Sequence, residues 1–507
     1  MIKNTILFFL TLAIVTGQAF AQRKGKKAPA KAAPAAAPAP AVPAVAAPAS
    51  AEQAEKEAAK KYGVSEELLE AIKRKRMLND KDFEKKKEGG FFTGLPLINS
   101  DPNTGVGYGA RVFYFYNGEK DNPLFRRTPY RSQLYAQFFQ TTNGYQYHEI
   151  NLDSPYIGNS LFRLRTAFVF EKNTWAHFYG NNSRSMNALG SDFGGGAKTY
   201  DKYADFNTEL RKVDANNFTN SAFNRYSYER PALVAFLERD LFGGIVRPQI
   251  GMQVSKYNIN DLMNREVQAD KTTLASGVVT ADKGINNPTL LTLYNQAGLI
   301  NGYNGGFNNV ARAGIAIDTR DYEPNPNKGQ MFEAIVDVSN RAYGSEFNFA
   351  RYTVSEKFFF SPFEKIVDLV VAGRAAYTQV VGDAPFYVMD QFSSTERTYQ
   401  NGLGGLRSLR GYKAARFVAS NMALANLELR WTMFDFTVFG QHFAPMLIPF
   451  FDIGSAFDQP KDISTSVWRY AYGAGLRLAW NQATIIMVDY AMSKEDSNMF
   501  IHFSHIF

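Results

Sequence analysis

The stretch GGLRSLRGYKAARF, residues 404–417, holds the residues whose types and spacing most clearly suggest a specific electrostatic contact. Its three arginines are Arg407, Arg410 and Arg416. A guanidinium presents five N–H donors in a planar fork that matches a carboxylate, and such charge-assisted bonds are stronger than neutral ones. The stretch therefore predicts that Arg410 lies against an acidic partner from elsewhere in the chain.

Patterns that would carry catalysis are scarce in the rest of the sequence. The five histidines form no H-E-x-x-H zinc motif, and no G-x-S-x-G nucleophile motif occurs. His502 and His505 are three residues apart on a predicted strand and would face opposite sides, which argues against a shared metal. The glycine-rich residues 192–200 fall in a predicted outside loop, where a phosphate-binding loop is not expected. We therefore expect a protein that is not an enzyme and has no metal or other cofactor.

The first fifty residues indicate export. One lysine precedes an apolar run from Ile6 to Val15, and an A-x-A cleavage pattern ends at Ala21. This is typical of a secretory signal peptide, residues 1–21, because the apolar run is shorter than the ~20 residues that span a membrane. Residues 22–50 are rich in alanine and proline and predict a semi-rigid periplasmic linker. The chain has no cysteine, which excludes disulfides, thiolate metal sites and cysteine-linked lipids.

The segment 51–90 is predicted to be a helical periplasmic segment. Ser65 is a suitable N-cap for a helix with an acidic first turn and a basic end, as the helix dipole favours. Leu68, Leu69 and Ile72 form a short apolar stripe on that helix. Two interpretations remain open: the helix rests on the periplasmic rim of the next domain, or the 51–88 helices dock a periplasmic partner or anionic lipid head groups.

From residue 91 to residue 507 apolar and polar residues alternate with a period of two, which indicates β-strands. No apolar run of about 18 residues follows the signal peptide, which argues against a helical membrane protein. A soluble sandwich would also alternate, but 14% of residues are aromatic, tyrosine and tryptophan recur beside apolar faces, and the last residue is Phe507. These features favour an all-β transmembrane antiparallel β-barrel.

About sixteen strands can be counted, an even number, as a closed bacterial barrel requires. They are predicted at residues 91–98, 105–116, 130–142, 144–153, 160–172, 226–239, 245–258, 309–319, 329–339, 346–360, 366–380, 418–432, 444–457, 467–479, 483–492 and 498–507. Short turns such as SPYIGNS and LFGG fall on one side, and the long connections 173–225, 259–308 and 381–417 fall on the other. Outer-membrane barrels have short periplasmic turns, so the N-terminal segment is expected in the periplasm.

Four motifs in chain order resemble those of the bacterial surface antigen superfamily, the outer-membrane assembly factors of the BamA/TamA type. The matching residues are a periplasmic turn motif (Asp318, Arg320, Pro324, Gly329), a lumenal loop motif (Leu409, Arg410, Gly411, Tyr412), an acidic residue on the twelfth strand (Glu428) and an F-x-D-x-G motif on the thirteenth strand (with Asp452 and Gly454). The proline of the turn motif lies one place further on than in the family. The resemblance covers residues 91–507.

The resemblance implies that the loop motif folds into the lumen and that Arg410 pairs with Asp452, with Glu428 as a second partner. It also implies a seam between the first and last strands that opens sideways and presents unpaired strand edges to an incoming chain. We accordingly expect a bacterial outer-membrane protein, in contact with outer-membrane lipids, that assembles or translocates proteins or lipids. The alternative is a passive pore or a structural surface-antigen barrel, in which the cluster merely braces a loop.

The sequence departs from the family at both ends of the predicted barrel. The best-known members carry periplasmic POTRA modules that capture clients, whereas residues 22–90 hold only the linker and helices, as in a POTRA-less member. Unfolded outer-membrane proteins and a periplasmic partner of the 51–88 helices are therefore the partners to test, and nucleic acid is not expected. The closing strand keeps the family's pattern at Ile501, Phe503 and Phe507 but has His505 where an apolar residue is preferred.

Overall fold

The computed structural model describes residues 51–507 apart from a set of short segments. These are residues 74–82, 85, 103, 192–197, 211–212, 215–216, 219–221, 264–265, 268–271, 275–276, 280–283, 286–287, 322–324, 397–398, 439–440, 481–483 and 504. The predicted signal peptide and linker, residues 1–50, lie outside the described residues, as does Pro324. No helix in the described part of the chain is long and apolar enough to cross a membrane.

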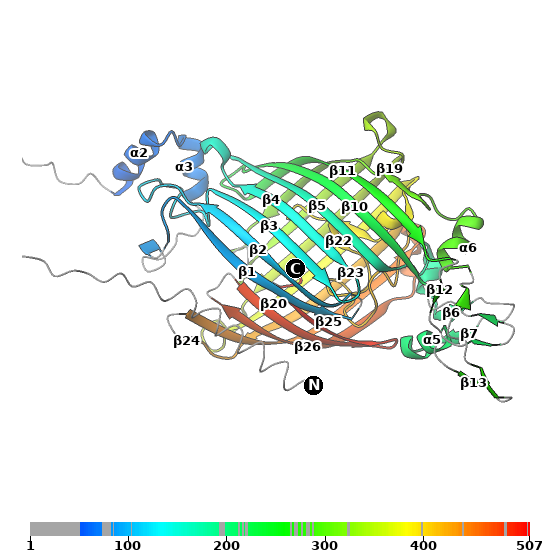
Figure 1. Cartoon of the computed structure of the whole chain (residues 1–507). Coiled ribbons are helices and arrows are strands. Elements are labelled where there is room, and N and C mark those ends of the chain that lie inside the picture. The colour runs from blue at the N-terminus through cyan, green and yellow to red at the C-terminus, as the bar shows by residue number, and fades with distance from the viewer. Residues whose placement is uncertain are drawn as a thin grey trace, which may run out of the picture. The chain divides into compact units, whose positions relative to one another are not determined.

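Sixteen long strands form one closed antiparallel barrel (Figure 1). In chain order, which is also their order around the wall, they are β1 (Gly90–Asp101), β2 (Gly105–Tyr116), β3 (Ser132–Thr141), β4 (Gln146–Ser154), β5 (Phe162–His177), β10 (Arg225–Arg239), β11 (Val246–Asp261), β17 (Val310–Asp318), β18 (Gly329–Ser339), β19 (Phe349–Phe360), β20 (Leu369–Gly382), β23 (Asn421–Thr432), β25 (Gln441–Phe457), β26 (Arg469–Trp480), β27 (Thr484–Ser493) and β28 (Ser497–Phe503). The sheet closes where β28 pairs with β1. The predicted fold is confirmed.

Shorter elements occupy the connections. Two three-residue strands extend the wall beside β11 and β25: β16 (Gly305–Phe307) and β24 (Phe436–Val438). The remaining strands are β6 (Leu189–Ser191), β7 (Lys198–Tyr200), β8 (Val213–Asp214), β9 (Asn217–Phe218), β12 (Glu266–Val267), β13 (Thr272–Leu274), β14 (Gly277–Val279), β15 (Gly284–Ile285), β21 (Gln391–Ser393) and β22 (Tyr399–Asn401). The helices are α2 (Ala51–Lys61), α3 (Glu66–Lys73), α5 (Tyr203–Glu209) and α6 (Leu290–Gln296), with 3₁₀ turns η1 (Ile157–Asn159), η2 (Ser183–Met186), η3 (Arg341–Tyr343), η4 (Phe386–Val388) and η5 (Pro460–Ser464).

All sixteen predicted strands are present, and the predicted ranges 105–116 and 329–339 match β2 and β18 at both ends. The last predicted strand, 498–507, is wrong at its end, because β28 stops at Phe503. Short connections such as 155–161 and 240–245 lie at the end of the barrel where β1 begins, and the long connections lie at the other. We call these the short-turn end and the long-loop end.

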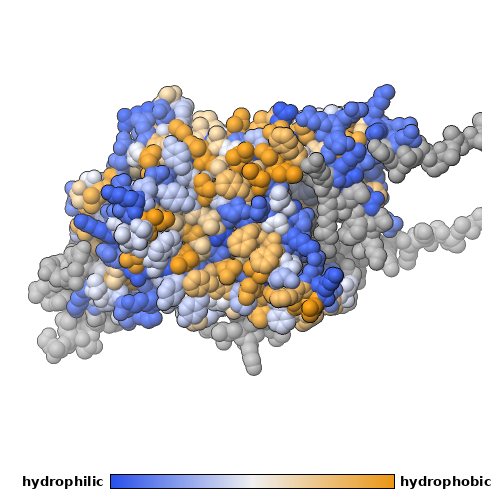
Figure 2. Space-filling view, turned by 180° about the vertical axis from the view of Figure 1, so that it is seen from behind, coloured by the Kyte–Doolittle hydropathy of each residue, from blue (hydrophilic) through white to orange (hydrophobic). Residues whose placement is uncertain are grey.

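Successive residues of each strand face alternately outward and into the lumen, which follows from the two-residue period of a strand. On β19, Phe358 and Phe360 are 39% and 48% exposed on the outer face, whereas Phe359 between them is 3% exposed. Figure 2 shows apolar side chains gathered across the middle of the visible barrel face, with hydrophilic ones more common toward its ends. This surface suits a barrel that is immersed in lipid.

The N-terminal helix α3 packs against turns at the short-turn end. Ser65 Oγ accepts a hydrogen bond from the backbone N–H of Leu68 at 3.2 Å, so the predicted N-cap is present. The predicted apolar stripe lies in one buried cluster with residues of two barrel turns: Leu68, Leu69, Ile72, Leu124, Tyr156 and Leu161. Burying each leucine or isoleucine contributes roughly 1.5–3 kcal/mol. The stripe therefore rests on the rim of the barrel, and a partner would have to bind the polar faces of the helices.

The connection between β20 and β23 runs through the lumen. Its hairpin of β21 and β22 is tied to the inner wall: Thr395 donates from its backbone N–H and Oγ1 to Glu333 Oε1 on β18, at 2.7 and 2.6 Å. The same residue is held by β11, two strands away from β18 in the wall: Gln249 donates to the carbonyl of Thr395 at 3.0 Å. Hydrogen bonds of this kind hold the connection against strands that are distant in sequence.

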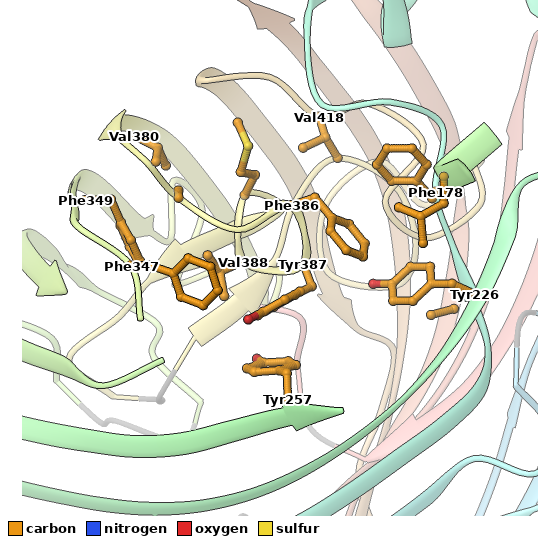
Figure 3. Close-up of a cluster of buried hydrophobic side chains, with 14 of the residues drawn as sticks. Phe178, Tyr226, Tyr257, Phe347, Phe349, Val380, Phe386, Tyr387, Val388 and Val418 are labelled. Atoms are coloured by element: carbon orange, nitrogen blue, oxygen red, sulfur yellow. The ribbon is translucent and has the colours of Figure 1, made fainter. Parts of the chain in front are cut away.

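Aromatic side chains fix the place where this connection enters the barrel at the long-loop end (Figure 3). Tyr387 of η4 stacks on Tyr257 of β11 with ring centroids 4.1 Å apart. Phe386 meets Tyr226 of β10 edge to face at 5.1 Å and Phe178 at 5.4 Å. Such pairs contribute about 0.5–1.5 kcal/mol each beyond their burial. The cluster thus anchors the loop that carries Arg410.

Candidate functional site

Arg410 lies in the connection between β20 and β23 and is fully buried in the lumen. Its Nε and Nη2 donate to the two carboxylate oxygens of Asp452 at 2.9 and 2.8 Å. Its Nη1 donates to Glu428 Oε1 at 2.9 Å and to Asp489 Oδ2 at 2.8 Å. The guanidinium also lies over the ring of Phe450, 3.4 Å from its centroid. The predicted pairing of Arg410 with Asp452 and Glu428 is present, and Asp489 is a third partner.

Three strands bring these carboxylates to one place on the inner wall. Glu428 comes from β23, Asp452 from β25 and Asp489 from β27. Their chain neighbours Leu427 and Phe451 are exposed on the outer face, as the alternation predicts. The acidic side chains therefore face the lumen because the adjoining residues are apolar and face outward.

Two further arginines complete the arrangement. Arg430 Nε donates to Glu428 Oε2 at 2.9 Å, and Arg477 Nη2 donates to Glu428 Oε1 at 2.6 Å and to Asp489 Oδ2 at 3.2 Å. We call the set Arg410, Arg430, Arg477, Glu428, Asp452 and Asp489 the arginine cluster. It holds three charges of each sign. Burial opposes the charge of Arg410. The carboxylate of Asp452, followed by those of Glu428 and Asp489, nevertheless raises the pKa of the Arg410 guanidinium above its ordinary value, so this group stays charged.

The other residues of the loop motif explain how Arg410 is held. Leu409 and Tyr412 belong to a buried apolar cluster, and the Tyr412 ring meets Phe417 edge to face at 4.9 Å. A Cβ on Gly411 would lie 2.7 Å from a backbone atom of Met492 in β27, so only glycine fits there. The carbonyl of Arg410 accepts a hydrogen bond from Asn498 of β28 at 3.1 Å.

Gly454, predicted from the motif on β25, also leaves room for the loop. A Cβ at this position would lie 2.9 Å from Leu403 Cδ2 and 3.0 Å from the carbonyl oxygen of Ala423. Asn426 on the adjacent strand donates to the carbonyl of Ser408 at 2.8 Å. The motif residues of β23 and β25 therefore form both the charged partners and the space for the loop.

The predicted turn motif forms a second ionic group at the short-turn end. Arg320 donates from Nε and Nη2 to the two oxygens of Asp318, each at 2.9 Å, and Arg247 Nη2 donates to Asp318 at 2.6 Å. Arg320 also pairs with Glu396 of the lumenal hairpin at 2.5 Å. Gly329 has φ +99°, and a Cβ there would lie 2.3 Å from the carbonyl oxygen of Thr319. The turn motif thus contacts the same connection as Arg410 through a different segment.

The closing seam joins β28 to β1. Ile501 pairs with Val488 of β27 and with Ser100 of β1, and Ser100↔Ile501 is the only register pair between β1 and β28 among the described residues. Phe503 pairs with Ile486 and ends the strand. Phe507 is not in the strand as predicted: residues 505–507 turn into the lumen.

The physical reason for this difference is the position of His505. Met499 on the outer face of β28 is 41% exposed, and continuation of the alternation would turn residue 505 outward as well, so that an imidazole would face lipid. In the structure His505 is buried and lies beside Arg477 and Asn325. His502 remains in the strand, so the two histidines do not share a strand as expected.

Sequence reasoning did not identify Asp489, Arg430, Arg477 and Asn325. Asp489 could have been found, since it is a lone acid in the apolar segment TIIMVDYAMS. Arg430 and Arg477 alternate with apolar residues in their strands, but nothing in the sequence links either to Glu428. Asn325 lies in the turn between β17 and β18, and its contact with His505 depends on the fold.

The arrangement is suited to holding a loop and a seam, and it offers no reacting group. Every charged group of the arginine cluster has an oppositely charged partner within 3.2 Å. Among the residues that the structure describes, no group of three or more histidines and acids could hold a metal ion. The expectation that the chain has no cofactor stays a prediction.

Two family models match the sequence. The Omp85 superfamily domain matches residues 122–504, about three quarters of the chain, and a domain of unknown function, DUF5982, matches residues 68–131. No curated protein matches the chain.

The solved structures to which this chain is similar include two bacterial proteins. BamA from Haemophilus ducreyi lacking POTRA domains 1–3 is 10% identical, with a TM-score of 0.45 over 83% of this chain and 70% of that chain. CdiB from Escherichia coli is 11% identical, with a TM-score of 0.46 over 87% of this chain and 74% of that chain.

Proposed function

Because the chain belongs to the Omp85 superfamily, we propose that it assembles or translocates proteins or lipids at the outer membrane through a β1–β28 seam that opens sideways. Members of this superfamily are not enzymes, and the chain is a bacterial outer-membrane barrel in contact with membrane lipids. The observation that carries the proposal is the pairing at the seam, where Ser100↔Ile501 is the only register pair in the described residues.

The two seam strands are well paired on their other sides. β1 pairs with β2 along its whole length from Gly90 to Asp101, and β28 pairs with β27 from Ser497 to Phe503. Unpaired backbone groups in lipid cost several kcal/mol each, so an edge that lacks its partner favours the addition of another strand. The seam is therefore the part of the wall that separates at the lowest cost.

The contents of the lumen weigh against the alternative of a passive pore. The hairpin of β21 and β22 and the loop motif lie in the lumen, and their connection is held by the aromatic cluster at one end and through Glu396 at the other. Lys357 and Arg320 both hold the Glu396 carboxylate, at 2.6 and 2.5 Å. This connection therefore lies in the path that a small solute would have to take.

The test is the folding rate of a heat-modifiable outer-membrane barrel reporter in liposomes that contain this protein. We expect acceleration that is lost in Arg410→Ala and in an oxidised Ser100→Cys/Ile501→Cys variant, whose disulfide would lock the seam. The chain has no cysteine of its own, so reduction should restore the second variant.

A matched control is Val488→Cys/Ile501→Cys, which links β28 to its neighbour on the other side. Its oxidation should leave the acceleration unchanged. Full acceleration with the seam locked would rule out lateral opening. No acceleration, in liposomes where correct incorporation is verified, would favour a translocator, a pore or a dedicated-partner role.

A further inference from the structure

Glu356 of β19 is an acidic residue on the lipid-facing side of the barrel. Its two neighbours in the chain are buried and face the lumen, so the alternation of the strand turns Glu356 outward. The outward residues on either side of it are exposed and apolar or aromatic: Tyr352 and Val354 toward the long-loop end, Phe358 and Phe360 toward the short-turn end. The carboxylate of Glu356 therefore lies within the apolar band of the wall and not at its edge.

The other charged residues that face outward from the described strands have a charged or aromatic partner. Ion pairs join Lys172 to Glu229 and Arg239 to Glu67, and Arg225 and Lys256 lie over the rings of Trp175 and Phe307. Among the residues that the structure describes, no ion pair or hydrogen bond reaches the carboxylate of Glu356. A carboxyl group that faces lipid is costly unless another polar group meets it, so Glu356 marks a contact with something outside this wall.

The surface beside Glu356 allows a close approach. Ala375 of β20 lies directly across from Glu356, and Ala425 of β23 lies across from Ala375. The ring of Phe358 covers Gly373 instead of the alanines, since a Cβ on Gly373 would lie 2.1 Å from it. We call Glu356, Ala375 and Ala425 the Glu356 patch. In lipid, small residues let two protein surfaces pack closely, and polar groups between them form hydrogen bonds that lipid does not supply.

A second copy of this chain is the occupant that the patch fits. Two copies inserted in the same orientation can pair about a two-fold axis normal to the membrane, which brings equivalent residues together at the same depth. A carboxyl group is complementary to itself at such an axis, because one protonated carboxyl donates a hydrogen bond to the other. The outward cations of this chain are already engaged with residues of their own wall, which favours the symmetric contact.

We propose that the Glu356 patch is the centre of a two-fold interface between two copies of this chain within the membrane. The two Glu356 carboxyl groups share a hydrogen bond, and Ala375 and Ala425 let the two walls pack against each other. The interface lies on β19, β20 and β23, which are distant from the β1–β28 seam in the wall, so the inference does not depend on the proposed function.

The test is the association of chains that are reconstituted in liposomes. The chain has no cysteine of its own, so a Lys461→Cys chain carries a donor or an acceptor dye at one exposed position of the long-loop end. We expect energy transfer between the two dyes that persists when lipid is added. Glu356→Leu should lower this transfer by about threefold or more, whereas Glu356→Gln should keep it, because an amide is also complementary to itself. The matched control is Glu229→Leu, which removes an outward carboxylate outside the patch and should change nothing.

Exchanging the charge separates a direct contact between the two Glu356 side chains from a general effect on the wall. Glu356→Lys chains should not associate with each other, because two ammonium groups repel, but they should associate with the parent chain, in which the lysine meets a glutamate. Heat-modifiable migration on gels verifies that each barrel is folded.

Equal transfer in the parent and Glu356→Leu chains would overturn the proposal, as would the absence of transfer between Glu356→Lys and parent chains. A parent chain that stays monomeric would also overturn it, and would favour a cationic side chain of a different membrane protein as the partner of Glu356.

Discussion

Arg410 is the residue at which four distant segments meet: its own loop and the strands β23, β25 and β27. Removing one member of a buried ionic group leaves the others without compensation, and this costs more than the intact group contributes. The arginine cluster is therefore better understood as a device that sets the position of the loop than as a source of net stability. Removal of Arg410 should disturb both the position of the loop and the stability of the barrel.

We predict that Arg410→Ala lowers the free energy of unfolding by about 3–5 kcal/mol, because Asp452 then loses the guanidinium with which it makes a bidentate pair in the buried site. Arg410→Lys should also destabilise the barrel, because an ammonium cannot make the bidentate pair with Asp452. Urea-induced unfolding in detergent micelles, followed by tryptophan fluorescence, measures both. The control is Arg341→Ala at an exposed position, which should change the free energy by less than about 0.5 kcal/mol. An equally small effect at Arg410 would contradict the role assigned to it.

At the scale of elements, β28 is short because one residue does not suit the outer face. The strand keeps its outward apolar positions as far as Ile501, and His505 is the first polar residue that the alternation would turn toward lipid. The lumen offers this imidazole Arg477 and Asn325 as partners instead. The end of the strand and the inward course of residues 505–507 are therefore two results of one polar residue in the alternating pattern.

We predict that acidification releases residues 505–507, which we call the tail, from the lumen. Burial lowers the pKa of His505 well below its ordinary value of 6.5, and the positive charges of Arg430 and Arg477 lower it further. The negative charge of Glu428 acts in the opposite direction but does not outweigh them. The neutral imidazole is thus the bound form, and the tail is held fully above pH 6.5. Below pH 6.5 the His505 imidazole of a released tail takes up a proton more readily than that of a bound tail. Binding of the tail therefore weakens as the pH falls, until the pH passes the lowered pKa of the bound His505.

The register Ser100↔Ile501, continued one residue at a time, would bring residue 506 opposite Leu95 if β28 lengthened. A Leu95→Cys/Ile506→Cys chain can therefore form its disulfide only when the tail leaves the lumen, and its cross-linking is compared between pH 7.5 and pH 5. The control is the same chain with His505→Asn, since the reactivity of the thiols cancels in the ratio of the two chains. The measured quantity is the ratio of cross-linking in the chain that keeps His505 to cross-linking in the His505→Asn chain. We expect this ratio to rise on acidification. A ratio that does not change with pH would show that protonation of His505 does not control the tail.

At the scale of the whole molecule, the connection between β20 and β23 occupies the lumen of the barrel. Its hairpin is bound near the short-turn end through Glu396 and at mid-lumen through Thr395, and η4 is bound at the long-loop end. These contacts engage β10, β11, β18 and β19 on one side, while Arg410 engages β23, β25 and β27 on the other. The loop therefore braces both halves of the wall.

We predict that deleting residues 391–401 opens a conductive path. The backbone N–H of Gly402 donates to the carbonyl of Asp390, so a short Gly-Ser link can join the two ends of the hairpin. Planar-bilayer recordings should show a conductance at least several-fold above that of the intact chain. Glu396→Gln, which keeps the hairpin and weakens its contacts with Arg320 and Lys357, should give only a small change. Equal conductance in the intact and deleted chains would mean that the hairpin does not block the lumen.

The sequence by itself determined the strands, their faces and several members of the site. Each strand's inner and outer residues follow from a local two-residue period, so Glu428 and Asp452 could be assigned to the lumen from their apolar neighbours. The resemblance of the loop motif then linked Arg410 to both. The boundaries of β2 and β18 were predicted correctly because glycines and polar turns mark them clearly.

Only the tertiary structure decided which distant residues share the lumen. Asp489 became the third partner of Arg410 because barrel closure brings β27 to the loop, and Asn325 meets His505 across 180 residues of chain for the same reason. Residues 505–507 turn inward because the imidazole of His505 would face lipid on the outside, whereas Arg477 and Asn325 are its partners inside. A local period contains neither of these environments, so the sequence could flag His505 as unusual but could not say where it would go.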